Sequence, residues 1–118
     1  MQPWILVAAG GAAGSMLRYG VQKLLPVQSF PYGTFATNMA GCLLIGCFWA
    51  LFLKGAISTD GRLLLMTGFC GGFTTFSAFM LESMQLLQTG RAGTFILYSA
   101  VSIGLGLLAT FCGFKMFQ

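Results

Sequence analysis

The sequence lacks most of the residues that soluble proteins place on their surfaces. Only 7% of its 118 residues are charged, whereas an average soluble domain carries roughly 25%. Histidine, the commonest general base and metal ligand, is absent, and the only acids are Asp60 and Glu82. The six basic residues are scattered and form no run that would bind nucleic acid. These absences exclude an ordinary soluble enzyme, a nucleic-acid-binding protein and a disordered chain.

What the sequence has instead is apolar length. Hydrophobic residues make up 57% of the chain, and its mean hydropathy is +0.85. A helix needs roughly 20 apolar residues to cross the hydrocarbon core of a bilayer. Four stretches meet this need, at residues 3–25, 32–53, 62–87 and 92–114. We therefore expect an all-α membrane protein whose residues 1–118 form a single four-helix transmembrane domain.

The first stretch is expected to be a retained span. A secretory signal peptide begins with a basic segment, and the first four residues contain no basic side chain. The four cysteines all lie in apolar stretches, and no two are spaced as C-x-x-C. They are therefore expected to pack as small apolar residues rather than to bind zinc or form a redox pair.

The distribution of positive charge gives no preferred orientation. Four spans place both termini and the second loop on one side of the membrane, and the first and third loops on the other. Cytoplasmic loops normally carry an excess of Lys and Arg. Here each side has three: Lys54, Arg62 and Lys115 on the first, and Arg18, Lys23 and Arg91 on the second. We expect insertion in both orientations and an antiparallel homodimer; the alternative is that one basic residue dominates and fixes a single orientation.

The third stretch contains a predicted helix break between Gly71 and Ser77. Its Gly-Gly pair weakens a helix by about 1 kcal/mol per glycine, and the Thr-Thr pair and Ser77 can bond the backbone locally. Non-helical backbone at that depth must be buried in protein or line a watery cavity. Its free carbonyls can then coordinate a small cation. The alternative is a continuous, flexible helix that uses its glycines for close contacts.

Three further features allow either a transport role or ordinary packing. Phe76 and Phe79 share a helix face just after the break, and their positive ring edges can face an anion, although phenylalanines in membranes usually pack against lipid or protein. Asn38 is the only asparagine, and its amide can either line a pore or join two helices. Hydroxyl and small residues recur every four positions in the last stretch, and the hydroxyls can either pass an anion along or bond their own helix. That stripe comprises Thr94, Tyr98, Ser102, Gly106 and Thr110.

Two of the charged side chains within the spans are candidates for a role in transport. Arg18 can snorkel to the interface or hold a positive potential at a pore mouth. Glu82 follows the predicted break and can pair with a hydroxyl or a basic residue; a proton-coupled carrier would place such an acid on its transport path.

The motifs taken together resemble the Fluc (CrcB-type) family of fluoride channels over essentially the whole chain. The residues that carry the resemblance are Gly71-Gly72-Phe73-Thr74-Thr75-Phe76-Ser77-Ala78-Phe79, Gly10-Gly11 with Gly14, Arg18 and Tyr19, and Gly33-Thr34 followed by Asn38 and Gly41. Two positions depart from the family pattern. Ala78 stands where a threonine is often found, and Gly106 stands where a second serine of the polar track is often found.

The resemblance implies a function and a set of site residues. It implies an antiparallel, dual-topology homodimer in a prokaryotic cytoplasmic (inner) membrane, with two pores that export fluoride passively and so lower intracellular fluoride, and no enzymatic activity. It implies a structural sodium ion at the dimer interface, held by the backbone carbonyls of Gly71 and Thr74. The implied pore residues are Phe76, Phe79, Asn38, Ser77, Thr75, Tyr98 and Ser102, with Arg18 at a vestibule and Glu82 as a partner of the polar track.

Two other functions fit the composition less well. Small multidrug-resistance exporters also have about four spans and can have dual topology, but their proton-coupling acid lies in the first helix, where this chain has none. A membrane assembly subunit is the non-transport alternative. Such a scaffold has no need for a costly helix break in mid-membrane.

Overall fold

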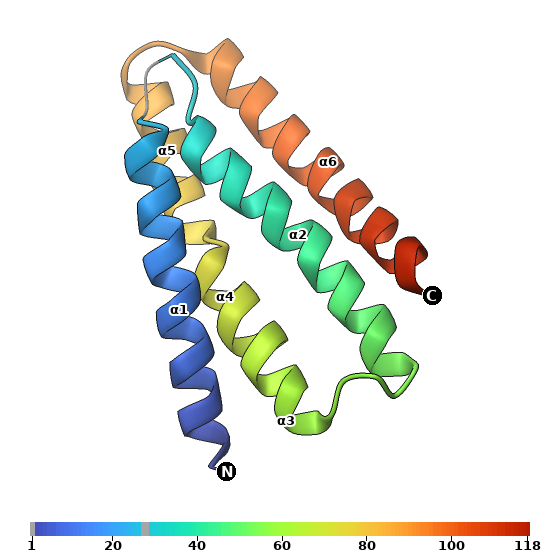
Figure 1. Cartoon of the computed structure of the whole chain (residues 1–118). Coiled ribbons are helices and arrows are strands. Elements are labelled where there is room, and N and C mark those ends of the chain that lie inside the picture. Colours follow the sequence, from blue (N-terminus) through green and yellow to red (C-terminus); the bar gives the residue numbers. More distant parts are fainter. Residues whose placement is uncertain (1, 27–28) are drawn as a thin grey trace.

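The computed structural model describes residues 2–26 and 29–118, and every regular element in that part of the chain is helical (Figure 1). Four rods follow one another. They are α1 (Pro3–Leu24), α2 (Tyr32–Leu53), a composite rod of α3 (Thr59–Arg62), η1 (Leu63–Cys70), α4 (Gly71–Phe73) and α5 (Phe76–Gln88), and finally α6 (Ala92–Phe117). Each predicted stretch corresponds to one rod, with ends that differ by at most three residues.

Three rods of the described chain are long and apolar enough to cross a membrane: Tyr32–Leu53, Thr59–Gln88 and Ala92–Phe117. Helix α1 has the same length as α2, 22 residues, but is less apolar, since Arg18, Gln22 and Lys23 lie in its second half. The all-helical membrane architecture is thus confirmed, while α1 as a fourth span stays a prediction.

The rods pack in two pairs that diverge toward one end. Helix α1 lies along η1 and α4, and α2 lies along α6. Figure 1 shows the pairs close together at the end that holds α5 and spread apart at the end that holds α3. Both termini and the α2–α3 connection lie at the spread end, and the α1–α2 and α5–α6 connections lie at the other. Consecutive rods therefore run in opposite directions.

Glycines allow α1 to touch the backbone of the composite rod. A Cβ atom on Gly10 would collide with the carbonyl oxygen of Leu64, and one on Gly14 would collide with that of Phe69. Such small-residue contacts let membrane helices approach closely. The facing segment, η1, is a π-helix of eight residues. It was not predicted, because π-helices are rare and have no strong sequence pattern.

We expect Gly10→Ala to lower stability strongly and Gly20→Ala to leave it unchanged or slightly higher. The added methyl at Gly10 has no room against the backbone of η1, and overpacking of this kind typically costs about 1–3 kcal/mol. Gly20 lies in the same helix, and no atom of a neighbouring segment lies within 4 Å of the place that an added methyl would take. Alanine there therefore only improves helix propensity. Thermal unfolding of the two variants in detergent measures the difference; equal melting temperatures would contradict this account of the interface.

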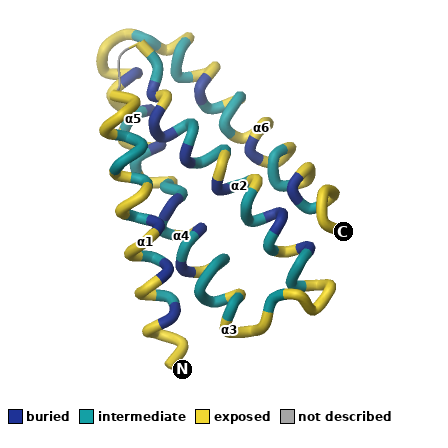
Figure 2. Tube along the Cα trace, in the orientation of Figure 1, coloured by how far each residue is buried: buried dark blue, intermediate teal, exposed yellow. Residues whose placement is uncertain are grey.

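Exposed residues occur along every rod (Figure 2), and many of them are large apolar side chains. Trp4, Leu107 and Phe76 are 84%, 74% and 72% exposed. A soluble monomer rarely exposes apolar area on this scale. Lipid or a second chain must therefore cover this surface. A small core forms where α2, α5 and α6 meet and consists of Phe79, Leu86 and Tyr98, with Phe30, Phe35 and Phe95 packed against it.

The helix break is present and narrower than predicted. Thr74 and Thr75 are extended, with φ/ψ of −89°/159° and −150°/117°. The expectation that the break reaches from Gly71 to Ser77 is wrong, because both glycines and Ser77 are helical. The break is formed by the two threonines, whose side chains bond the backbone where the helical hydrogen bonds stop. Thr74 Oγ1 donates to the Cys70 carbonyl (2.8 Å), and Thr75 Oγ1 accepts from the Ala78 N–H (3.0 Å) and so caps α5.

Gly72 is needed for a close contact between helices and not for an unusual backbone conformation. A Cβ atom there would meet the carbonyl oxygen of Gly11 and crowd Ser15. The glycine therefore keeps α4 against α1 just before the chain leaves the helix.

Candidate functional site

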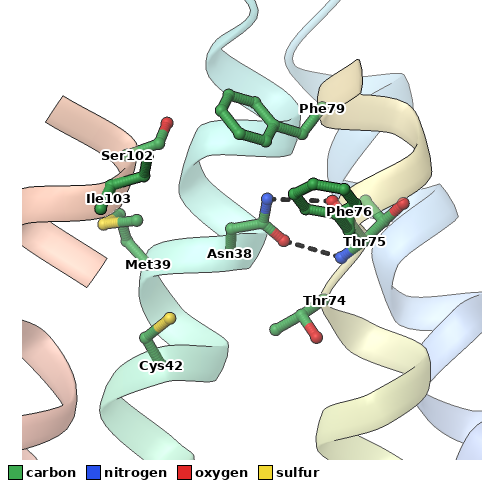
Figure 3. Close-up of a pocket in the computed structure, with 9 residues that line it drawn as sticks. All are labelled: Asn38, Met39, Cys42, Thr74, Thr75, Phe76, Phe79, Ser102 and Ile103. Carbon is green, nitrogen blue, oxygen red and sulfur yellow. Dashed lines mark hydrogen bonds between the residues drawn. The ribbon is translucent and has the colours of Figure 1, made fainter. Parts of the chain in front are cut away.

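A groove of about 260 Å³ opens beside the helix break, between α2, α5 and α6 (Figure 3). Four predicted pore residues, Asn38, Thr75, Phe76 and Phe79, meet there with a fifth, Ser102. The remaining lining residues are Met39, Cys42, Thr74 and Ile103. The fold thus brings together residues that are up to 64 positions apart in the sequence.

Asn38 binds the extended backbone at two points. Its Oδ1 accepts from the Thr75 N–H (2.7 Å), and its Nδ2 donates to the Thr75 carbonyl (3.1 Å), as the dashed lines in Figure 3 show. The orientation of the amide is set by the peptide, since the backbone N–H can only donate and the carbonyl can only accept. Asn38 therefore joins two helices by replacing the ladder bonds that Thr75 has lost. One Nδ2 hydrogen remains for another acceptor.

Aromatic rings form a row along one side of the groove. Phe76 and Phe79 have centroids 6.0 Å apart at 68°, and Phe79 meets Tyr98 at 4.9 Å and 87°. Phe79 is buried, whereas Phe76 is largely exposed. Edge-to-face rings present positive edges in different directions. The shared face that was predicted for Phe76 and Phe79 is thus present, although their surroundings differ.

Glu82 is held by hydroxyl groups and not by a basic residue. Tyr98 Oη donates to its Oε1 (2.9 Å), and Thr34 Oγ1 donates to its Oε2 (2.7 Å). Gln22 Nε2 in turn donates to Thr34 Oγ1 (3.1 Å). Tyr98 and Thr34 are almost fully buried. The network therefore ties α1, α2, α5 and α6 together around one carboxylate.

Arg18 is used at the break. Its Nε donates to the carbonyl oxygen of Gly72 (2.9 Å). A cation at the end of a helix interacts favourably with the helix dipole, and here the helix end is that of α4. The side chain thus satisfies one carbonyl that the break releases, and its remaining guanidinium donors stay available for a vestibule role.

Three other carbonyls at the break accept no hydrogen bond within the described residues: those of Gly71, Phe73 and Thr74. By contrast, Gly72 and Thr75 have partners in Arg18 and Asn38. Free carbonyls of an unwound helix are typical sodium ligands. No group of three or more His, Cys, Asp or Glu residues in the described chain forms a metal site of another kind.

The remaining predicted site residues differ in position. Ser102 Oγ is buried without a hydrogen-bond partner and lines the groove. Ser77 is exposed, lies outside the lining and has its Oγ 3.3 Å from that of Thr75. Thr110, the last residue of the hydroxyl stripe, bonds the carbonyls of Cys42 and Gly106, so it joins α6 to α2. The stripe is therefore partly a helix contact.

Sequence reasoning missed Gln22 and assigned Thr34 no site role of its own. Thr34 lies one turn before Asn38, which was a usable signal, whereas the contact of Gln22 with it depends on the packing of α1. The four cysteines are free, as expected, but only Cys47 and Cys70 are buried. Cys42 lines the groove and Cys112 is exposed.

Comparison with known proteins gives a near full-length match. The family model described as "CrcB-like protein, Camphor Resistance (CrcB)" matches residues 5–114. Relatives named fluoride-specific ion channel FluC are similar over almost their whole length. The protein of Phocaeicola vulgatus is 44% identical over 98% of each chain. Those of Flavobacterium psychrophilum and Thermus thermophilus are 47% and 44% identical, covering 96% and 98% of this chain and 94% and 95% of theirs.

Proposed function

This chain belongs to the CrcB-like family, and from that premise we propose that it is a fluoride-selective ion channel and not an enzyme. Fluoride would leave the cell passively across the prokaryotic cytoplasmic membrane. The observation that carries the proposal is the near full-length similarity to proteins named as fluoride channels. The residues that meet in the groove beside the helix break give the proposal its physical basis.

Fluoride is small and strongly hydrated, so removing its water is costly unless other donors replace it. The groove offers the free Nδ2 hydrogen of Asn38, the unpartnered hydroxyl of Ser102 and the ring edges of Phe76 and Phe79. None of these groups carries a full positive charge. An anion can therefore be coordinated there without being held too tightly to leave.

Passive conduction needs no coupling residue. An inside-negative potential favours the exit of an anion by about 2.3 kcal/mol per 100 mV. Both oxygens of Glu82 already accept hydrogen bonds from Thr34 and Tyr98. The carboxylate thus supports a polar track of Tyr98 and Ser102, without having to carry a proton. Thr75 and Ser77 extend this track at the start of α5.

The working unit is proposed to be an antiparallel homodimer of four-span chains. A helix of 22 residues such as α1 is about 33 Å long at 1.5 Å per residue, enough to span a bilayer. Phe76 projects from the protomer at the open groove, and a second copy would complete the pore walls. Equal numbers of basic residues toward the two ends permit both orientations. Labelling of single cysteines at residues 55 and 90, in a variant whose four native cysteines are replaced, tests this, since each must react from both sides of the membrane.

A sodium ion is proposed at the break, held by the carbonyls of Gly71 and Thr74. These oxygens fit a hard cation and lack donors in the described chain. The ion would stabilise the extended segment of each chain at the interface. Thermal unfolding in sodium chloride and in N-methylglucamine chloride tests this: the protein should melt at higher temperature in sodium, and equal melting temperatures would exclude a structural sodium ion.

The function is tested by anion efflux from liposomes that contain the purified protein. A fluoride electrode should record rapid efflux that depends on valinomycin, and a chloride electrode should record none. Absence of fluoride efflux from folded protein would overturn the proposal. The small multidrug-resistance type of exporter would instead give proton-coupled transport, which a pH gradient without valinomycin reveals; the lack of an acid in α1 argues against it.

A further inference from the structure

A second pocket, of about 170 Å³, is lined by residues just before α2, in the second half of α5 and between α5 and α6. It is separate from the groove at the helix break, because the two share no lining residue. Two of its lining residues, Pro31 and Leu86, are buried. The other lining residues are polar and at least partly exposed: Ser29, Glu82, Gln85, Thr89 and Arg91.

The pocket and the groove are joined by a continuous set of contacts. Glu82 lines the pocket and accepts a hydrogen bond from Tyr98. Tyr98 packs edge-on against Phe79, which lines the groove. Along α5, Phe79, Glu82 and Gln85 recur every three residues, so they lie toward one face of the helix. The pocket is therefore connected to the site at the break through packed side chains.

Arg91 supplies the only positive charge among the residues that line this pocket. Its Nη2 donates to the Ser29 carbonyl and lies 3.5 Å from Thr94 Oγ1. Its Nε and Nη1 groups donate to no described residue, so three of the five guanidinium hydrogens can bond an anion. The opposing charge, Glu82, already accepts two hydrogen bonds.

We propose that this pocket is an entry site for a small monovalent anion, and that Arg91 captures fluoride there before it passes to the groove. The inference rests on the proposed function and adds a binding site outside the aromatic and hydroxyl residues. A fixed positive charge in a concave, partly buried mouth raises the local anion concentration. Its effect must weaken as salt screens the charge, because the Debye length falls from about 10 Å at 0.1 M to about 3 Å at 1 M ionic strength.

The test compares three variants in fluoride-loaded liposomes across a range of fluoride concentrations. Arg91→Gln removes the charge at the pocket. Arg91→Lys keeps the charge but loses the planar fork that holds the Ser29 carbonyl. Lys23→Gln removes the same charge from the exposed last turn of α1, at the same end of the molecule but outside the pocket.

For Arg91→Gln we expect the half-saturating fluoride concentration to rise about fivefold at low ionic strength, with a smaller rise in 1 M inert salt and little change in maximal flux. Arg91→Lys should restore most of the loss, and Lys23→Gln should match the unmodified protein. If Arg91→Gln lowers only the maximal flux, or if Arg91→Lys does not restore the half-saturating concentration, Arg91 only holds the Ser29 carbonyl. Either result would overturn the proposed capture site. If the unmodified protein conducts no fluoride, the proposed function itself fails.

Discussion

Replacing Phe79 by isoleucine should reduce fluoride efflux by at least roughly tenfold while the protein still folds. Loss of about 1.4 kcal/mol of stabilisation at the barrier is enough for this change, and an aromatic edge contact is worth about that much. Phe79 is 6% exposed, lines the groove and meets Tyr98 edge-on. Isoleucine keeps the site apolar but has no positive ring edge for the anion.

The cost to folding must be separated from the effect on flux. Phe79 belongs to the buried core of the chain, so a change of shape there costs about 1–3 kcal/mol. The measurement is therefore efflux normalised to the amount of protein that elutes as the native assembly. Phe111→Ile is the matched control, because Phe111 is a 56% exposed residue of α6 outside the groove. Equal efflux from folded Phe79→Ile and Phe111→Ile proteins would remove Phe79 from the mechanism.

Replacing Asn38 by alanine should both destabilise the protein and abolish efflux. The change leaves the N–H and the carbonyl of Thr75 without the partners that they have in Asn38. Each unsatisfied buried polar group costs about 1–3 kcal/mol, so the total is on the order of 2–6 kcal/mol. The melting temperature should therefore fall, and fluoride efflux should be lost.

Two further variants separate this effect from general damage to α2. Thr37 is one position away and is buried, but its hydroxyl bonds only the Thr34 carbonyl of its own helix. Thr37→Val should therefore change stability by less than about 1 kcal/mol. Asn38→Asp keeps the acceptor for the Thr75 N–H and loses the donor to its carbonyl, so its stability should lie between those of the unmodified protein and Asn38→Ala. If Asn38→Ala melts like Thr37→Val, the amide does not support the break.

The local sequence was enough to predict the helices, but only part of the helix break. Apolar length and turn residues were enough to place four rods with ends within a few residues, because each rod depends on its own composition. The break in the third rod was predicted in the right segment, but it was attributed in part to the wrong residues. Gly71 and Gly72 stay helical. The extended backbone occurs at Thr74 and Thr75, and the Asn38 amide replaces the helical hydrogen bonds that Thr75 has lost.

At the site, the sequence identified which polar residues are unusual, but it did not show what they contact. Rare polar residues in apolar stretches identified Asn38, Glu82 and Arg18 as special, because a buried polar group in a membrane is too costly to occur without a reason. Their partners could not be read from spacing. Arg18 contacts the Gly72 carbonyl, 54 positions away, and Glu82 takes hydroxyls from two other helices.

The sequence by itself determined that this protein is an apolar, helical membrane chain with a defect in its third long helix, and its motifs were specific enough to indicate the family. Composition and periodicity are local properties, and they suffice for such statements. Only the tertiary structure decided which polar groups satisfy one another, that eight residues before the break adopt a π-helix, and that Arg91 stands at a pocket continuous with Glu82. These features depend on contacts between distant segments, whose free energies are set by packing and not by any one stretch of residues.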